Sequence, residues 1–141
     1  MVVAPHLILV REGKVLMHLR ANSGYEDGKY SLIAGHVEGG ESMRQAMIRE
    51  TYEEAGVILK PADVVLKVTV HRKSSDREQA EPFFEATKWE GEIKNLEPHK
   101  CSDLSWFPID DLPANTIPYI AQAIEAYRNG TNYLEIGFEK A

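Results

Sequence analysis

The stretch that decides the fold of this 141-residue chain covers residues 35–57 and reads GHVEGGESMRQAMIRETYEEAGV. It opens with a glycine-rich turn. Ser42, followed three residues later by Gln45, forms a capping box that predicts the start of a helix. Gly56 is placed to end this helix in a left-handed conformation. Good helix formers and no proline stand between these signals, so a helix is predicted between Ser42 and Gly56.

Three carboxylates share one face of this predicted helix. Glu50, Glu53 and Glu54 are spaced i, i+3, i+4 and fall within a face about 100° wide. Two such charges ~5 Å apart repel by roughly 3 kcal/mol at an effective dielectric of 20. The face is therefore either a solvated acidic surface or a site for hard divalent cations, which bind clustered carboxylate oxygens. The stripe expected to face the core consists of Ile48, Tyr52 and Ala55.

The composition limits the classes of function. The chain has 16 Lys and Arg against 22 Asp and Glu, a net charge of −6, which disfavours binding of long nucleic acid. The single cysteine, Cys101, excludes an intrachain disulfide and a multi-cysteine zinc site, and fits a cytoplasmic protein. No apolar run approaches the ~20 residues of a membrane span, and residues 1–6 lack the features of a signal peptide. We expect a single domain over residues 1–141.

Outside the central helix the sequence alternates between strand-like and turn-like segments. A second helix is predicted over 118–128, with proline in its first turn and Gly130 after its end. Residues 21–29 and 73–81 are predicted to be loops. These patterns indicate an α+β (mixed α/β) fold. Strands are predicted at 6–10, 14–20, 30–34, 64–72, 82–89, 104–107 and 133–138.

The spacing of the central stretch resembles a known family signature. Gly35, five residues, Glu41, seven residues and then the segment 49–57 (RETYEEAGV) resemble the box of the Nudix hydrolases. Thr51 stands where the family prefers an aliphatic residue, which is a matter of packing. The resemblance implies a Nudix fold, in which helices sandwich a central mixed sheet. It also implies hydrolysis of a phosphoanhydride bond with Mg²⁺ or Mn²⁺.

The resemblance extends beyond the box towards the MutT-like branch, which hydrolyses nucleoside triphosphates. Glu97, five residues after the segment 89–92, matches a glutamate that supplies a further metal ligand. Asn115 matches an asparagine that reads an oxidised guanine, and Arg20 an arginine that holds phosphate. Each has a plainer interpretation: a loop surface residue, a turn or cap residue, and a surface charge at a strand end. Ala34 replaces a glycine whose backbone carbonyl is a ligand.

The resemblance implies a role for each of these residues. Arg49 is expected to pair with a box carboxylate and hold it in place. Glu50 is either a metal ligand or the base that activates the attacking water. The expected catalytic residues are Glu50, Glu53, Arg49 and Glu41. The expected metal ligands are Ala34, Glu50, Glu53, Glu54 and Glu97. The expected substrate-binding residues are Arg20, Gly35 and Asn115.

Three functions remain open from the sequence. The preferred one is metal-dependent hydrolysis of a purine nucleoside triphosphate, with an intact or an oxidised base, to monophosphate and pyrophosphate. The same box would serve ADP-ribose, dinucleoside polyphosphates or nucleotide sugars, because the pocket chooses the substrate. A non-catalytic nucleotide-binding module of the same fold is the alternative from a different class. The expected partner is a small nucleotide, with no long nucleic acid and no membrane, and the protein is expected to be a monomer or homodimer.

Overall fold

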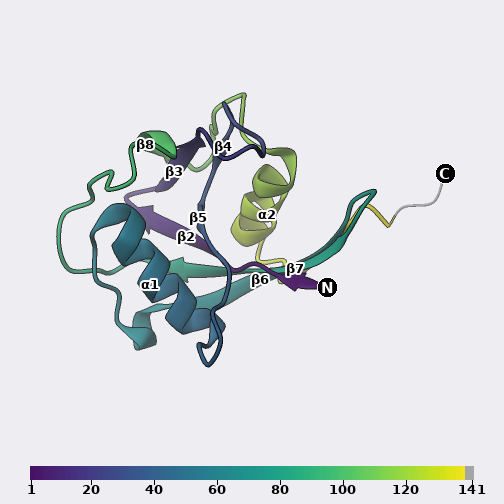
Figure 1. Cartoon of the computed structure of the whole chain (residues 1–141), viewed down its shortest axis with the longest axis horizontal. Coiled ribbons are helices and arrows are strands. Elements are labelled where there is room, and N and C mark those ends of the chain that lie inside the picture. Colours follow the sequence, from purple (N-terminus) through teal and green to yellow (C-terminus); the bar gives the residue numbers. More distant parts are fainter. Residues whose placement is uncertain (139–141) are drawn as a thin grey trace.

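The computed structural model describes residues 1–138 and shows a mixed β-sheet with an α-helix on each face (Figure 1). The strands of the described residues are β1 (Val2–Val3), β2 (His6–Arg11), β3 (Lys14–Arg20), β4 (Tyr30–Ser31), β5 (Ile33–Ala34), β6 (Val65–Lys73), β7 (Glu78–Ala86), β8 (Cys101–Pro108) and β9 (Tyr133–Ile136). The helices are α1 (Met43–Ala55), α2 (Pro118–Asn129) and a short 3₁₀ helix (Pro61–Asp63).

The sheet combines hairpins with parallel neighbours. Its order is β4-β3-β2-β7-β6-β9, with β1 beside β7, β5 beside β2, and β8 beside β3. β2 runs parallel to β7, and β6 runs parallel to β9, whereas β2–β3 and β6–β7 are antiparallel. β5 pairs with the start of β2 so that Ala34 lies opposite His6. The first residues of the box are thereby anchored to a central strand.

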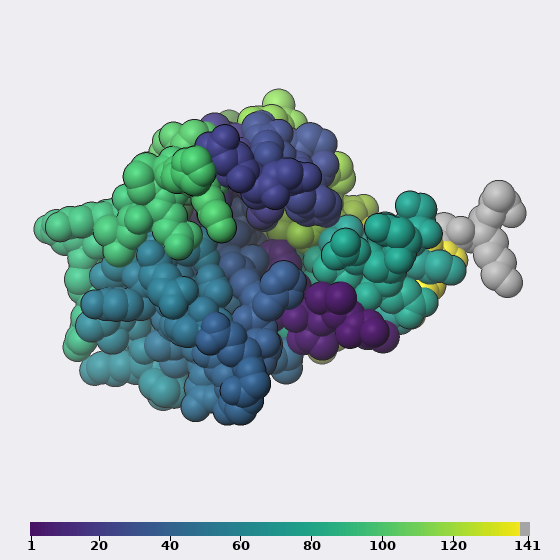
Figure 2. All heavy atoms as spheres, in the orientation of Figure 1, coloured from purple at the N-terminus to yellow at the C-terminus, as the bar shows by residue number. Residues whose placement is uncertain are grey.

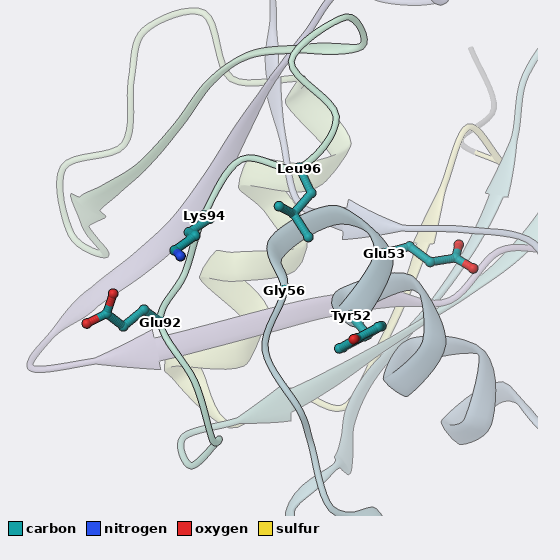
Figure 3. A pocket seen from close by; sticks show the side chains of 6 residues that line it. All are labelled: Tyr52, Glu53, Gly56, Glu92, Lys94 and Leu96. Atoms are coloured by element: carbon teal, nitrogen blue, oxygen red, sulfur yellow. The ribbon is translucent and has the colours of Figure 1, made fainter.

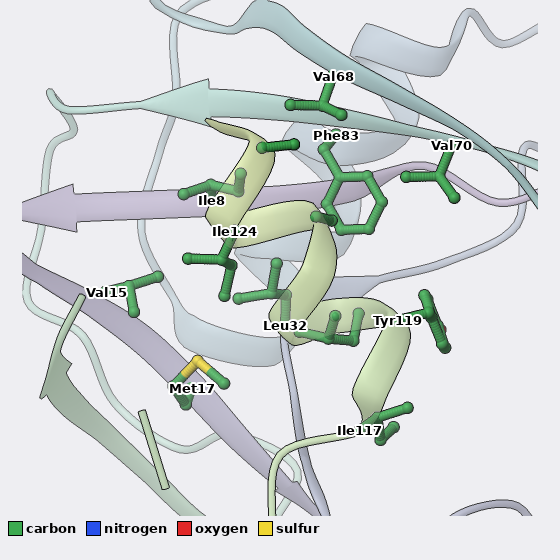
Figure 4. Packing of buried hydrophobic residues seen from close by; sticks show 13 residues of the cluster. Ile8, Val15, Met17, Leu32, Val68, Val70, Phe83, Ile117, Tyr119 and Ile124 are labelled. Atoms are coloured by element: carbon green, nitrogen blue, oxygen red, sulfur yellow. The ribbon is translucent and has the colours of Figure 1, made fainter. Parts of the chain in front are cut away.

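Two hydrophobic clusters fill the spaces between the sheet and its helices. One lies under α2, where Ile8, Val70 and Phe83 of the sheet pack against Ile120 and Ile124 (Figure 4). The other lies under α1 and includes the following buried residues: Leu7, Leu9, Ile33, Met47, Ala55 and Phe84. The sheet is apolar on both faces because each face carries a helix. This arrangement confirms the expected α+β class and the expected sheet between helices.

The ends of α1 match the sequence signals, but its buried face does not. Ser42 and Gln45 form the capping box, and Gly56 ends the helix at φ 75°. The predicted inward position of Tyr52 is wrong, because its side chain is 56% exposed. The buried side of the helix is rotated by about one residue and includes Thr51, whose hydroxyl donates to the Met47 carbonyl at 2.6 Å. Because that hydroxyl has a hydrogen-bond partner within the helix, a polar residue can occupy this buried packing position.

The hairpin of β6 and β7 is longer than predicted. Lys73 pairs with Glu78, so the expected loop over 73–81 shrinks to the turn at residues 74–77. Polar residues at this end of the hairpin hid the strand pattern in the sequence. The segment predicted as one strand over 30–34 is divided into β4 and β5. In residues 1–138, neither helix has the length and hydropathy that crossing a bilayer would take.

Candidate functional site

Arg49 on α1 is the centre of a cluster of carboxylates. Its Nε donates to Glu41 Oε2 at 2.8 Å, and its Nη1 donates to Glu50 Oε1 at 2.9 Å and to Glu53 Oε1 at 3.3 Å. Nη2 donates to the carbonyl of His36 at 3.1 Å. The hydrogen bond with Glu41 is the main reason why the pKa of Arg49 is raised and that of Glu41 is lowered. One guanidinium thus joins the box loop to the box helix.

Glu54 differs from its neighbours because it is buried. Its residue is 9% exposed, and Oε1 lies 3.4 Å from Nδ1 of His18. Oε2 is enclosed and has no hydrogen-bond partner among the described residues. Burial, followed by the close approach and charge of Glu50 and then by the charges of Glu97 and Glu53, raises its pKa well above the ordinary value. A buried carboxylate that lacks a partner is costly, and a cation would relieve that cost.

The segment after Trp89 docks on the end of α1 and brings Glu97 to the cluster. The backbone N–H of Lys94 donates to the Ala55 carbonyl at 3.0 Å, and that of Leu96 donates to the Glu54 carbonyl at 3.1 Å. These bonds use carbonyls that a helix end leaves without partners. The proximity of Glu97 is seen in its effect on the pKa of Glu54. Glu97 therefore lies beside the box helix, and its expected role as a metal ligand stays a prediction.

A shallow pocket lies between this segment and α1. Its volume is about 450 Å³, and it is lined by Tyr52, Glu53, Gly56, Glu92, Lys94 and Leu96. Figure 3 shows the carboxylate of Glu53 extending away from Glu92 and Lys94. The pocket therefore borders the carboxylate cluster on its outer side.

Gly35 is required by the close approach of Glu50. A Cβ at residue 35 would lie 2.3 Å from Cδ and 2.4 Å from Oε1 of Glu50, so a larger residue would displace that carboxylate. The Gly35 N–H donates to the Pro5 carbonyl at 3.3 Å, which ties the turn to the start of β2. Ala34 precedes it at the end of β5.

We expect Gly35→Ala to lower kcat by about 10- to 100-fold, because the new methyl group displaces the Glu50 carboxylate by an ångström or more. Gly39→Ala is the matched control in the same turn, since a Cβ there meets nothing within 4 Å. The measurement is kcat for both variants, with circular dichroism to confirm folding. Equal rates in the two variants would show that the position of Glu50 does not matter.

Arg20 and Asn115 both hold the loop at residues 21–29. Arg20 donates to the Tyr25 carbonyl at 2.8 Å and to Ser23 Oγ at 3.1 Å. Nδ2 of Asn115 donates to the Gly28 carbonyl at 3.0 Å. The structure brings these two residues together at one loop. Their expected contacts with phosphate and base stay predictions.

The sequence analysis missed a second polar cluster, under the start of α2. Arg72 on β6 pairs with Glu81 on β7, and the guanidinium lies over the ring of Tyr119. His6 on β2 is buried beside them. The signal in the sequence was the charge at 72 and 81 on adjacent strands that share one sheet face, but these residues fell at the edge of a predicted loop. Figure 2 shows a recess between the dark-blue segment at 21–29, the blue loop after β5 and the teal β6–β7 hairpin.

The carboxylate cluster is the candidate metal centre, although its side chains do not converge on one point as metal ligands would. Within residues 1–138, no three Asp, Glu, His or Cys side chains surround one point as a metal would require. Arg49 accounts for this, because it holds oxygens of Glu41, Glu50 and Glu53. The unpartnered oxygen of Glu54 still fits a cation.

Comparison with known proteins gives a consistent set of similarities. The family model described as NUDIX domain matches residues 1–127. The chain is 35% identical over 115 residues to the NAD-capped RNA hydrolase NudC of Stutzerimonas stutzeri, and 33% identical over 119 residues to that of Chromobacterium violaceum. These matches cover 77% and 79% of this chain but 37% and 40% of the relatives. The chain thus spans about two fifths of the length of these curated relatives.

Solved structures agree with this assignment of the fold. The crystal structure of the MutT NUDIX hydrolase from Burkholderia pseudomallei has a TM-score of 0.80 and 28% identity, covering 88% of this chain and 95% of that one. The solution structure of the E. coli ORF135 protein has a TM-score of 0.70 and 26% identity, covering 91% of each chain. The expected Nudix fold is confirmed by these neighbours.

Proposed function

Because this chain belongs to the NUDIX domain family, we propose that it is a pyrophosphohydrolase that cleaves the phosphoanhydride bond of a nucleoside diphosphate linked to another group. The observation that carries this proposal is the complete carboxylate set of the box around Arg49, together with the buried, unpartnered oxygen of Glu54. A structural module would have no reason to retain so many repelling charges at one helix end.

The proposed cofactor is Mg²⁺ or Mn²⁺, bound by carboxylate oxygens. Glu53, Glu54 and Glu97 would hold the ion together with the backbone carbonyl of Ala34, and Glu50 is available as a further ligand or as the base. When bound, the metal neutralises substrate phosphate and lowers the pKa of a water molecule. Oε2 of Glu54 supports this assignment, because it is a buried acceptor without a donor in residues 1–138.

Side chains of the protein itself orient the carboxylates of the site. Arg49 fixes Glu41 and Glu50 through 2.8 Å and 2.9 Å hydrogen bonds, so these two side chains enter the reaction already positioned. Glu50 lies directly over Gly35, where the absence of a Cβ leaves room for the Glu50 carboxylate itself. If Glu50 is the base, this position lets it accept a proton from a water molecule bound over the turn.

Two substrate classes are proposed for this site. A purine nucleoside triphosphate, with an intact or an oxidised base, is supported by the likeness to a MutT NUDIX hydrolase at 28% identity. A dinucleotide with an internal diphosphate is supported by relatives described as NAD-capped RNA hydrolases. The second class runs against the expectation that no long nucleic acid is bound, an expectation that rests on the net charge of −6. Substrates of both classes would place a diphosphate group against the box. We also propose that the protein is cytoplasmic.

The deciding experiment follows nucleoside monophosphate, the product common to all the candidates, by chromatography. The panel contains guanosine, oxidised guanosine and adenosine triphosphates, ADP-ribose, NAD, a dinucleoside polyphosphate, a nucleotide sugar and NAD-capped RNA, each with Mg²⁺ or Mn²⁺. We expect release from at least one of them. Binding of nucleotides without release from any would identify a non-catalytic module instead.

We expect Glu97→Gln to weaken the binding of the metal, because one ligand charge is lost. The Mg²⁺ concentration for half-maximal rate should rise by about tenfold. Glu92→Gln, an exposed residue of the same segment, serves as the control and should leave that concentration unchanged. The measurement is a Mg²⁺ titration of the rate. If both variants behave alike, Glu97 is only a surface residue.

A further inference from the structure

Arg72 is held rigidly in a largely buried position. Its side chain is 13% exposed and that of Glu81 is 1% exposed. Nε donates to Glu81 Oε1 at 2.7 Å, and Nη2 donates to Glu81 Oε2 at 3.0 Å and to Gln79 Oε1 at 2.6 Å. The guanidinium carbon lies 3.8 Å from the centre of the Tyr119 ring. Three of the five N–H groups and one face of the guanidinium are therefore fixed.

The two remaining N–H groups of Arg72, both on Nη1, have no hydrogen-bond partner in residues 1–138. Nη1 is also absent from the enclosed, unpartnered atoms of the described residues, so it is open to solvent. A donor that is fixed in position and free on one edge is arranged to receive an acceptor. This feature goes beyond what a buried ion pair needs for stability.

The place of this donor is next to the start of the box. His6 pairs with Ala34 across β2 and β5, and also lies opposite Phe83 on β7. The His6 ring stacks on Phe83 at 4.6 Å and contacts Tyr119. The exposed Tyr25 lies on the loop held by Arg20, close enough to Arg72 and Tyr119 to influence the pKa of both. Arg72 therefore lies on the β6–β7 hairpin and close to the loop at 21–29, the two segments that border the recess in Figure 2.

The chemistry of the cluster selects a neutral acceptor. Glu81 already compensates the charge of Arg72 and would repel a phosphate. His6 Nδ1 donates to the Ala4 carbonyl at 2.8 Å, and burial lowers the pKa of the ring. Nε2 of neutral His6 therefore accepts a hydrogen bond from the Tyr119 hydroxyl, over 3.3 Å. Because the Tyr119 hydroxyl already donates to His6, Arg72 is the donor that remains for a ligand.

We infer that Arg72 reads the substrate's nucleobase, by donating from Nη1 to an exocyclic carbonyl oxygen, so that the enzyme favours 6-oxopurines over adenine. This rests on the proposed function for the identity of the ligand as a nucleotide. The carbonyl of a 6-oxopurine accepts the N–H groups, whereas the 6-amino group of adenine opposes them with its own hydrogens. Discrimination of roughly 10- to 100-fold is expected from such a contact.

The test compares inosine monophosphate with adenosine monophosphate, which differ in the purine only at position 6 and its neighbouring N1. Calorimetry with Mg²⁺ present gives the dissociation constants for the whole chain, independently of hydrolysis, because neither monophosphate has a phosphoanhydride bond. Inosine monophosphate is expected to bind at least about tenfold more tightly. Equal affinities, or tighter binding of adenosine monophosphate, would overturn the inference.

The residue assignment is tested with Arg72→Gln combined with Glu81→Gln, which removes both buried charges together. The preference is expected to fall to about onefold in this variant and to shrink in Arg72→Lys, which keeps the charge but loses the fork. Arg128→Gln, at the far end of α2, is the matched control and should keep the preference. If the double variant keeps the full preference, another group reads the base. If the double variant does not fold, the full preference in Arg72→Lys would lead to the same conclusion.

Hydrolysis provides a separate measurement. On matched inosine and adenosine substrates, the Arg72 variants should raise KM for the inosine form while leaving kcat unchanged, because the base lies away from the reacting bond. A lowered kcat with unchanged KM would contradict base reading. Absence of hydrolysis on every nucleotide, with selective binding of inosine monophosphate intact, would remove the proposed function but leave this inference standing.

Discussion

Glu54→Gln is expected to lower kcat by about 100-fold or more and, in metal-free buffer, to raise the melting temperature. The loss of rate follows from the loss of a proposed metal ligand. The gain in stability follows from burial of the Glu54 carboxylate without a donor for Oε2, beside Glu50. For a chain of this size, about 1 kcal/mol of relief corresponds to roughly 2–4 °C. Both quantities are measured on one preparation, by steady-state kinetics and calorimetry.

The stability gain should depend on pH in a defined direction. Because the pKa of Glu54 is raised in the folded protein, the wild type is penalised at pH values above the ordinary carboxyl pKa, and the penalty is complete above the raised pKa. As the pH falls towards the ordinary carboxyl pKa, protonation removes the same charge and the two proteins should converge. A difference that grows on acidification would contradict the burial of a charged carboxylate.

Two comparators separate the two effects. Glu53 is 49% exposed in its side chain, so Glu53→Gln should lower kcat with little change in melting temperature. Glu125→Gln, on the exposed side of α2, should change neither quantity. Near-normal kcat in folded Glu53→Gln would remove that residue from the site, and near-normal kcat in Glu54→Gln would do the same for Glu54.

Removal of divalent cations with a chelator is expected to abolish hydrolysis, and added Mg²⁺ or Mn²⁺ should restore it. An anionic diphosphate cannot approach the carboxylates of the box helix unless a cation lies between them. The measurement is the rate before chelation, after it, and after metal is returned. Full activity in the presence of chelator would overturn the proposed mechanism.

Metal binding should also be visible without any substrate. An ion that binds only the folded protein stabilises it by RT ln(1 + [L]/Kd), about 2.7 kcal/mol at a concentration 100 times Kd. The melting temperature of the wild type should therefore rise with Mn²⁺ concentration. The rise should be smaller in Glu54→Gln, which lacks one of the proposed ligands.

Most of the architecture could be predicted because the relevant signals are local. The capping box at Ser42 and the left-handed Gly56 each act within a few residues, and both are present in α1. Apolar alternation likewise located the central strands to within a few residues. Strand ends were less predictable in the β6–β7 hairpin, where Arg72 and Glu81 are buried through each other's charge and not through apolar contact. No single-strand pattern reveals such a pair, because its members lie nine positions apart.

The candidate site was likewise predictable from the sequence in part, and in part fixed only by the fold. The sequence by itself determined the family signature, because the spacing of Gly35, Glu41 and the glutamates of 49–57 is a property of the chain alone. It also determined that three carboxylates would share one helix face, since the helical repeat fixes their angles. The tertiary structure decided which of them is buried: the sheet and the docked segment at 90–97 cover Glu54 and leave Tyr52 exposed. Pairing between strands likewise decided that Arg72 keeps one free edge, because only the fold brings Gln79 and Glu81 to the other N–H groups.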